Sequence, residues 1–193
     1  HCEVAKLKMD FMTRAQSLIH GDLHTGSIFI NEEDTKVFDP EFCFYGPMGY
    51  DIGNVIANMI FAWANGDAAG AEDFCKCLES LLVDVVNMTK EKMEKYYDEH
   101  VTDTMCKNAL YKKYYMDTII EDTSAVTGLE LIRRIVGMAN VKDITTIADE
   151  AKRARAEKIC ITAAIDFIKN RNDKKCGKCF LRTLKDAIAE IDA

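Results

Sequence analysis

Long hydrophobic runs are missing from this sequence of 193 residues, and no signal-peptide pattern opens it. A membrane-spanning helix needs about 20 consecutive apolar residues, so no segment qualifies. Positive charge is also scarce, because 25 lysines and arginines face 32 aspartates and glutamates, for a net charge of −7. Such a chain is a poor partner for nucleic acid or for an anionic membrane. The sequence therefore predicts a cytoplasmic globular protein.

Internal repeats, low-complexity segments and long linkers are absent from the sequence as well. Hydrophobic residues make up 48% of the chain, enough for one domain with its own core. In a reducing cytosol the eight cysteines should stay free thiols. Cys176 and Cys179 have the spacing of a metal or redox pair, but no second Cys or His pair lies at zinc-finger distance. We expect them in the turn that starts a helix.

Apolar residues at helical spacing predict a mostly α fold. The segment 54–65 is apolar nearly all round and should be the central buried helix, with Asp51 at its start. Residues 121–124 are polar and should interrupt the helical pattern. The tyrosines of residues 96–115 should lie in the core, with a substrate wall as the lesser alternative. The helices are expected at 2–19, 54–65, 71–88, 89–97, 128–139, 148–169 and 177–191, with a short turn at 141–144.

Two short runs rich in β-branched and aromatic residues, 27–30 and 36–38, flank a turn-forming segment and predict a β-hairpin. A hairpin brings its open ends together, so Asp22 should converge with Asp39 and Glu41. Like charges raise each other's pKa unless a cation lies between them, and Mg²⁺ prefers carboxylate oxygens. Phosphoryl transfer uses this arrangement: one aspartate orients the attacking hydroxyl, and the others hold the Mg²⁺ that bridges the nucleotide phosphates.

Residues 20–27 (HGDLHTGS) resemble the catalytic loop of the aminoglycoside phosphotransferase and choline kinase group of kinase-like enzymes. Together with residues 39–53 (DPEFCFYGPMGYDIG), they are similar to the methylthioribose kinase family in particular. Identity is recognisable over about residues 18–60, with a second patch near 133–143. The resemblance implies the mostly α C-terminal lobe of a protein-kinase-like fold with one small β-hairpin. Its segments over residues 1–193 would be a catalytic loop at 18–31, a metal loop at 39–53 and a helical region at 54–193.

The resemblance also implies an activity: ATP- and Mg²⁺-dependent phosphorylation of the sugar 5-methylthioribose to its 1-phosphate in methionine salvage. Asp22 would be the catalytic base and would contact the sugar. Adjacent helical residues point about 100° apart, so Arg133 and Arg134 alone would favour one surface arginine and one salt bridge. The resemblance instead places both at the substrate or the transferring phosphate. The other implied residues are Asp39 and Glu41 as metal ligands, Pro40 beside the nucleotide, and Ser27 where protein kinases place a metal-binding asparagine.

Three nearby residues have supporting interpretations. We expect His20 to brace the loop through a hydrogen bond to nearby backbone. His24 either faces the substrate or braces the same loop. In kinase-like folds an acid at the position of Asp51 accepts hydrogen bonds from the catalytic-loop backbone, a role compatible with capping its helix.

A glycine-rich loop after a strand and a strand lysine, which belong to the nucleotide-binding lobe of kinases, are not found in these 193 residues. We therefore expect the N-terminal lobe to be absent and this stretch alone to be inactive. The apolar face left bare should favour self-association, as in a homodimer. Two alternatives stay open: another kinase of the same group, acting on choline, homoserine or an aminoglycoside, or a non-catalytic kinase-like binding module.

Overall fold

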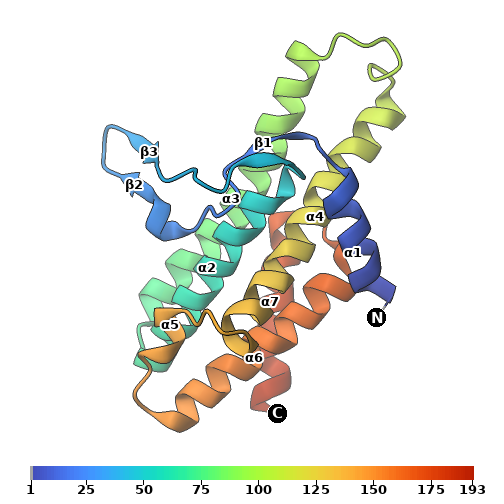
Figure 1. Ribbon diagram of the computed structural model, residues 1–193. Coiled ribbons are helices and arrows are strands. Elements are labelled where there is room, and N and C mark those ends of the chain that lie inside the picture. Colours follow the sequence, from blue (N-terminus) through green and yellow to red (C-terminus); the bar gives the residue numbers. More distant parts are fainter. Residues whose placement is uncertain (1) are drawn as a thin grey trace.

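The computed structural model describes residues 2–193 and is mostly α-helical (Figure 1). Two short 3-10 helices, η1 (Thr25–Ser27) and η2 (Arg171–Asp173), join the longer elements. The strands are β1 (Ser17–Ile19), β2 (Ile28–Ile30), β3 (Thr35–Val37) and β4 (Phe44–Gly46). The α-helices are α1 (Cys2–Thr13), α2 (Gly49–Ala69), α3 (Glu72–His100), α4 (Ala109–Val136), α5 (Lys142–Thr145), α6 (Glu150–Lys169) and α7 (Gly177–Asp192). Among the described residues, none of the helices is long and apolar enough to cross a membrane.

The strands form two separate two-stranded antiparallel sheets. Strands β2 and β3 pair with Ile28 opposite Val37, which confirms the predicted hairpin. Strand β1 pairs with β4, with Ser17 opposite Gly46. The expectation of one helix over residues 2–19 is therefore wrong. Helix α1 ends at Thr13, because the backbone of residues 17–19 is hydrogen-bonded to residues 44–46 instead of continuing a helix.

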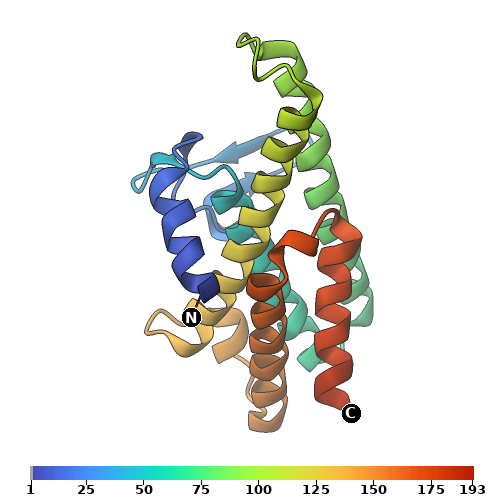
Figure 2. The ribbon, with the colours of Figure 1, turned by 90° about the vertical axis from the view of Figure 1, so that its right-hand side faces the viewer.

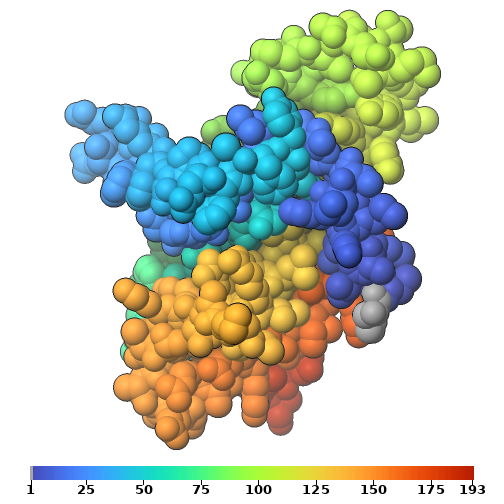
Figure 3. All heavy atoms as spheres, in the orientation of Figure 1, coloured from blue at the N-terminus to red at the C-terminus, as the bar shows by residue number. Residues whose placement is uncertain are grey.

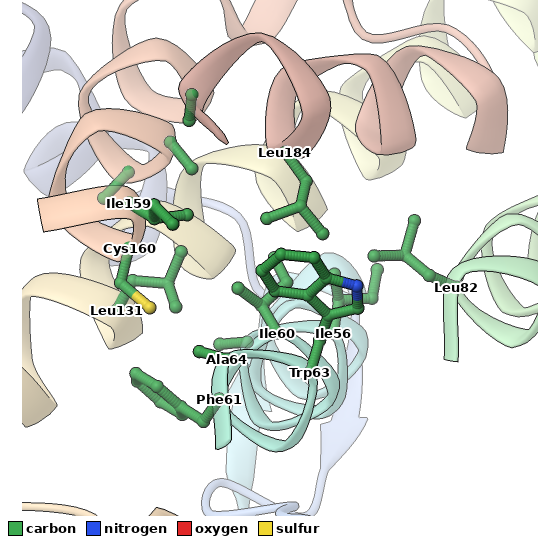
Figure 4. Close-up of a cluster of buried hydrophobic side chains, with 14 of the residues drawn as sticks. Ile56, Ile60, Phe61, Trp63, Ala64, Leu82, Leu131, Ile159, Cys160 and Leu184 are labelled. Atoms are coloured by element: carbon green, nitrogen blue, oxygen red, sulfur yellow. The ribbon is translucent and has the colours of Figure 1, made fainter. Parts of the chain in front are cut away.

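Helix α2 is the centre of the hydrophobic core, as its sequence predicted. Ile56, Ile60 and Phe61 are fully shielded from solvent. In Figure 4 the side chains of α2 meet neighbours from four other helices. The labelled neighbours are Leu82 of α3, Leu131 of α4, Ile159 and Cys160 of α6, and Leu184 of α7. The core is thus a helical bundle packed around α2, and the small sheets lie outside it.

Helices α3 and α4 are longer than expected, and both differences have a physical cause. Residues 89–92 were predicted to start a new helix, but they continue α3 because helix-forming lysine, glutamate and methionine follow without a glycine or proline. Residues 121–124 do not break α4. Their polar groups are satisfied inside the bundle: the Thr123 hydroxyl donates to the Ile119 carbonyl at 2.8 Å, and the Ser124 hydroxyl donates to the Phe167 carbonyl at 2.8 Å.

The outer ends of α3 and α4 project from the bundle on one side, and the β2–β3 hairpin projects on another (Figures 2 and 3). The tyrosines of residues 96–115 lie on the α3–α4 projection. The rings of Tyr97 and Tyr115 lie tilted to each other with 5.7 Å between their centroids, but Tyr96 and Tyr114 are largely exposed. The expectation that this tyrosine cluster fills the core is wrong, because the helix ends that carry it extend beyond the bundle.

Helices α6 and α7 are joined through the carboxylate of Asp166. It accepts hydrogen bonds from Lys174, from Asn170 and from the hydroxyl of Thr183 on α7. Burial alone would raise the pKa of Asp166, but these donors outweigh it and hold the pKa below its usual value. Because the folded-state pKa lies below the unfolded one, the carboxylate stabilises the fold above the unfolded pKa. That stabilisation is lost as the pH falls through the folded-state pKa.

We therefore expect Asp166→Asn to lower the free energy of unfolding at neutral pH by about 1 kcal/mol, or roughly 2–4 °C in melting temperature. The difference from the unsubstituted protein should shrink as the pH falls below about 4. Thermal unfolding followed by circular dichroism across this pH range measures both effects. Asp186→Asn, a matched change at an exposed position of α7, is the control. A pH-independent difference would contradict this account.

Candidate active site

The segment predicted as the catalytic loop, residues 18–31, is held by the start of helix α2. The Asp51 carboxylate accepts hydrogen bonds from the backbone N–H of His20 at 2.6 Å and from that of Gly21 at 3.0 Å. The His20 ring is hydrogen-bonded through Nε2 to the Phe38 carbonyl at 2.9 Å. The structure confirms both expectations: Asp51 holds the loop backbone, and His20 braces the loop.

Gly21 gives the loop the sharp turn that presents Asp22. Its φ is +85°, a conformation that residues with a Cβ rarely adopt. A Cβ at this position would lie 2.2 Å from the Phe42 carbonyl oxygen, which shows how closely the loop approaches the segment after β3. A glycine is therefore required directly before Asp22.

His24 and Ser27 interact with each other across η1. The Ser27 hydroxyl lies 3.2 Å from His24 Nε2, and Ser27 is buried, with 4% of its surface exposed. This contact supports the bracing role for His24. The same contact occupies the hydroxyl of Ser27, which was predicted to contact the metal. A metal contact through Ser27 stays a prediction, and its burial counts against it.

Asp22 lines a cavity of about 510 Å³ between the catalytic loop and helices α2 and α4. Most of the remaining wall is apolar, and Glu130 and Arg133 contribute its charged part. Besides Gly21 and these three residues, the cavity is lined by Phe42, Phe44, Tyr50, Asn54, Val126 and Leu129. Arg134 completes the charged group, because its guanidinium Nη2 lies 4.0 Å from Asp22 Oδ1. The structure thus brings Asp22 together with both predicted arginines.

Glu130 lies one turn before the two arginines in α4 and forms a salt bridge with each of them. Its buried carboxylate accepts from Arg134 Nε at 2.6 Å and from Arg133 Nη1 at 3.0 Å. Burial would lower the pKa of Arg133, but the Glu130 carboxylate outweighs it and raises that pKa. Arg134 is the more enclosed of the pair, with 20% of its side chain exposed against 53% for Arg133. Both arginines therefore reach the site, while each keeps a salt bridge.

Asp39, Pro40 and Glu41 lie on the exposed segment that follows the hairpin. Asp39 has a φ of +66°, which is uncommon for a residue with a side chain and is a form of backbone strain often found at functional sites. Among residues 2–193, no group of three or more His, Cys, Asp or Glu side chains could hold a metal ion. The expectation that Asp22, Asp39 and Glu41 converge on one metal site is therefore wrong for the described residues, because the segment after the hairpin lies exposed and apart from such a cluster. Asp39 and Glu41 still offer exposed carboxylate oxygens, which fit Mg²⁺ chemically.

Several lining residues were not anticipated from the sequence. The clearest is Glu130, although a signal for it was present: an acid three and four residues before two arginines on one helix can pair with both. Tyr50 and Asn54 carried no such signal. Both lie at the start of α2 beside Asp51 and face the cavity only because of how α2 crosses α4.

A catalytic loop held by a buried helix, an aspartate in a cavity and an acidic segment after a β-hairpin define the C-terminal lobe of a kinase-like fold. The family model described as "Phosphotransferase enzyme family" matches residues 4–81, which include the catalytic loop, the hairpin and helix α2. The match confirms the predicted fold class, while helix α4, which carries Glu130 and the two arginines, lies outside the matched residues.

Comparison with individual proteins is more specific than the family match, because the relatives below are all named methylthioribose kinases. The chain is 37% identical over 188 residues to "Methylthioribose kinase 1" of Oryza sativa subsp. japonica, a match that covers 88% of this chain and 43% of the relative. It is 37% identical over 188 residues to "Methylthioribose kinase" of Bacillus pumilus, covering 97% and 47%. With "Methylthioribose kinase" of Escherichia coli O45:K1 the identity is 33% over 185 residues, covering 88% and 44%. The predicted resemblance is confirmed, and the chain spans less than half the length of these relatives.

Replacing Asp51 tests the support of the catalytic loop. Asp51→Asn keeps the shape but leaves one carbonyl oxygen for two backbone N–H donors, so we expect a loss of about 1–3 kcal/mol in the free energy of unfolding. The amides of His20 and Gly21 should exchange with solvent faster than in the unsubstituted protein, as measured by NMR hydrogen exchange. Asp73→Asn makes the same change in the first turn of α3, at an exposed acid, and should leave both amides unaffected. Unchanged exchange in Asp51→Asn would contradict the assignment.

Proposed function

We propose that this chain carries the catalytic and sugar-binding part of a kinase that transfers the γ-phosphoryl group of ATP to 5-methylthioribose. The product would be the 1-phosphate, formed in methionine salvage in the cytoplasm. The single observation that carries the proposal is the placement of Asp22 in a 510 Å³ cavity with Arg133, and with Arg134 4.0 Å away. The methylthioribose kinases to which the chain is similar support the choice of sugar.

The roles of the charged residues follow from their positions. Asp22 orients the attacking hydroxyl of the sugar and accepts its proton, as the catalytic aspartate does in phosphoryl transfer. The guanidinium groups of Arg133 and Arg134 form hydrogen bonds to sugar hydroxyls or to the phosphoryl oxygens, because their planar donors suit anionic oxygen pairs. Glu130 keeps both guanidinium groups in place between turnovers.

The apolar part of the cavity suits the rest of this substrate. Phe42 and Phe44 contribute aromatic walls, and Val126 and Leu129 contribute aliphatic ones. A thioether is apolar and polarizable, and it makes favourable contacts with aromatic rings. The methylthio group would therefore lie against these walls while the ring hydroxyls meet the charged side. Choline and aminoglycosides are cationic, and two arginines at the cavity disfavour them.

Asp39 and Glu41 would hold Mg²⁺, and Pro40 would lie beside the nucleotide. When bound, the ion neutralises charge on the nucleotide phosphates. Exposed carboxylates compete with water for such an ion, so tight nucleotide binding needs the second wall of a closed cleft. We expect this wall to come from a nucleotide-binding lobe outside these 193 residues or from a second copy of the chain in a homodimer.

The activity is tested in the longest natural reading frame that contains these residues. It should phosphorylate methylthioribose with ATP and Mg²⁺, and Asp22→Asn should lower kcat by about a hundredfold or more while nucleotide affinity stays nearly unchanged. Asp84→Asn, an exposed aspartate of α3, is the matched control and should have no effect. Phosphorylation of choline or an aminoglycoside but not of the sugar would overturn the assignment. Nucleotide binding without phosphorylation of any of them would favour the binding-module alternative.

The metal assignment has a separate test. Glu41→Gln should raise the Mg²⁺ concentration that gives half-maximal activity, because it removes a charge from the ion's ligand set. Glu33→Gln, at the exposed hairpin turn, is the matched control and should leave the Mg²⁺ dependence unchanged. If Glu41→Gln also leaves it unchanged, Glu41 is not a ligand. A rise with Ser27→Ala alone would instead assign the ligand role to Ser27.

A further inference from the structure

We propose that Cys176 and Cys179 form a redox-active dithiol that is oxidised reversibly to an intramolecular disulfide by low-molecular-weight disulfides such as oxidised glutathione. The pair lies at the start of α7, and neither thiol takes part in the proposed phosphoryl transfer. The inference therefore stands independently of the proposed function.

The two sulfur atoms are already close. Cys176 Sγ lies 3.4 Å from Cys179 Sγ, and both residues are partly exposed. The backbone N–H of Cys179 donates to the Cys176 carbonyl at 2.9 Å, which closes the turn between them. A turn of this kind keeps its end Cα atoms within about 7 Å, and disulfides usually join Cα atoms about 4.4–6.8 Å apart. The bond could thus form through small side-chain movements.

The turn is held by α3, which keeps the thiols in this arrangement. The backbone N–H of Gly177 donates to the Asn87 side chain at 2.9 Å. A Cβ on Gly177 would lie 2.3 Å from the Val83 carbonyl oxygen, so the backbone of α7 touches that of α3 here. Phe180 follows directly and is fully buried against Phe167. Figure 2 shows α7 standing beside α6, with α3 behind it.

The surroundings of Cys179 lower the pKa of its thiol. Burial would raise the pKa of this thiol, but hydrogen bonds from the backbone at Lys175 and from Cys176, together with the charge of Arg182, outweigh it and lower the pKa. The N-terminal end of a helix also favours negative charge, and α7 is 16 residues long. Cys160 shows the contrast, because burial raises the pKa of its thiol to about 12 and leaves it unreactive.

Metal binding explains the pair less well. A structural zinc site needs four ligands, commonly two such pairs. Within the described residues no group of three or more His, Cys, Asp or Glu side chains could hold a metal. Two partly exposed thiols in contact, with no third ligand beside them in this part of the chain, fit thiol–disulfide exchange better.

The exchange balances with one small disulfide consumed per pair. The Cys179 thiolate attacks one sulfur of oxidised glutathione, forms a mixed disulfide and releases one glutathione thiolate, which takes up a proton. Cys176, after losing its proton, attacks Cys179 Sγ, forms the intramolecular disulfide and releases the second glutathione. In total the dithiol loses two protons and two electrons, and the small disulfide takes them up to become two glutathione thiols. Excess reduced glutathione reverses both steps.

Trypsin makes the product easy to identify, because it cleaves after Lys175, Lys178 and Arg182. The protein is equilibrated with mixtures of reduced and oxidised glutathione near neutral pH, alkylated with N-ethylmaleimide, digested and analysed by mass spectrometry. We expect the peptides 176–178 and 179–182 to appear as one disulfide-linked species. It should form at a lower proportion of oxidised glutathione than any adduct at the exposed Cys2, Cys43 or Cys77, and a dithiol should separate the peptides.

Cys176→Ser should abolish the linked species and leave Cys179 as a lasting mixed disulfide with glutathione. Serine is itself a favoured residue at this N-cap position, so this variant should fold. Cys77→Ser removes an exposed cysteine of α3 and, as the matched control, should leave the linked species unchanged. The proposal is overturned if Cys176 and Cys179 remain alkylated after the exposed cysteines have formed mixed disulfides. It is equally overturned if only glutathione adducts form at the pair.

Discussion

The candidate site depends on one interaction, the carboxylate of Asp51 with the backbone N–H groups of His20 and Gly21. Asp51 is itself largely buried at the first turn of α2, and α2 is the most enclosed helix of the bundle. A buried backbone N–H without a partner costs about 1–3 kcal/mol. Separating the catalytic loop from Asp51 is therefore energetically unfavourable. The position of Asp22 is thus set by the hydrophobic core, through a short chain of bonded groups.

The other half of the site is fixed by the same core from a second direction. Helix α4 crosses α2, and their contact contains the hydroxyl of Thr127, which donates to the carbonyls of Thr123 and of Gly53. One turn further along α4, Glu130 holds both arginines. The separation between Asp22 and Arg134 therefore reflects how two rigid helices pack. Helices hold side chains more precisely than free loops do, and the loop of Asp22 is tied to α2 through Asp51.

Much of this could be predicted from the sequence, for reasons that are local. The hairpin, the central helix and the bracing role of His20 follow from strand propensity, an apolar segment and a known loop pattern. What could not be predicted depends on partners distant in sequence. Strand β1 exists because residues 44–46 pair with it, and residues 121–124 stay helical because Phe167 offers a carbonyl to Ser124. Polar residues look like a break in a helix until the groups that satisfy them are known.

The segment around Asp39 is the part of the candidate site that the hydrophobic core does not fix directly. A residue with a Cβ at φ +66° is strained, and the following Pro40 further restricts the conformations open to it. Strain of this kind persists only where neighbouring contacts impose it, and here the His20 ring bonds the Phe38 carbonyl directly before Asp39. Thus His20, itself anchored through its N–H to Asp51, links the loop that carries Asp22 to the acidic segment. A rearrangement of residues 39–41 that keeps this hydrogen bond starts after Phe38 and leaves Asp22 in place.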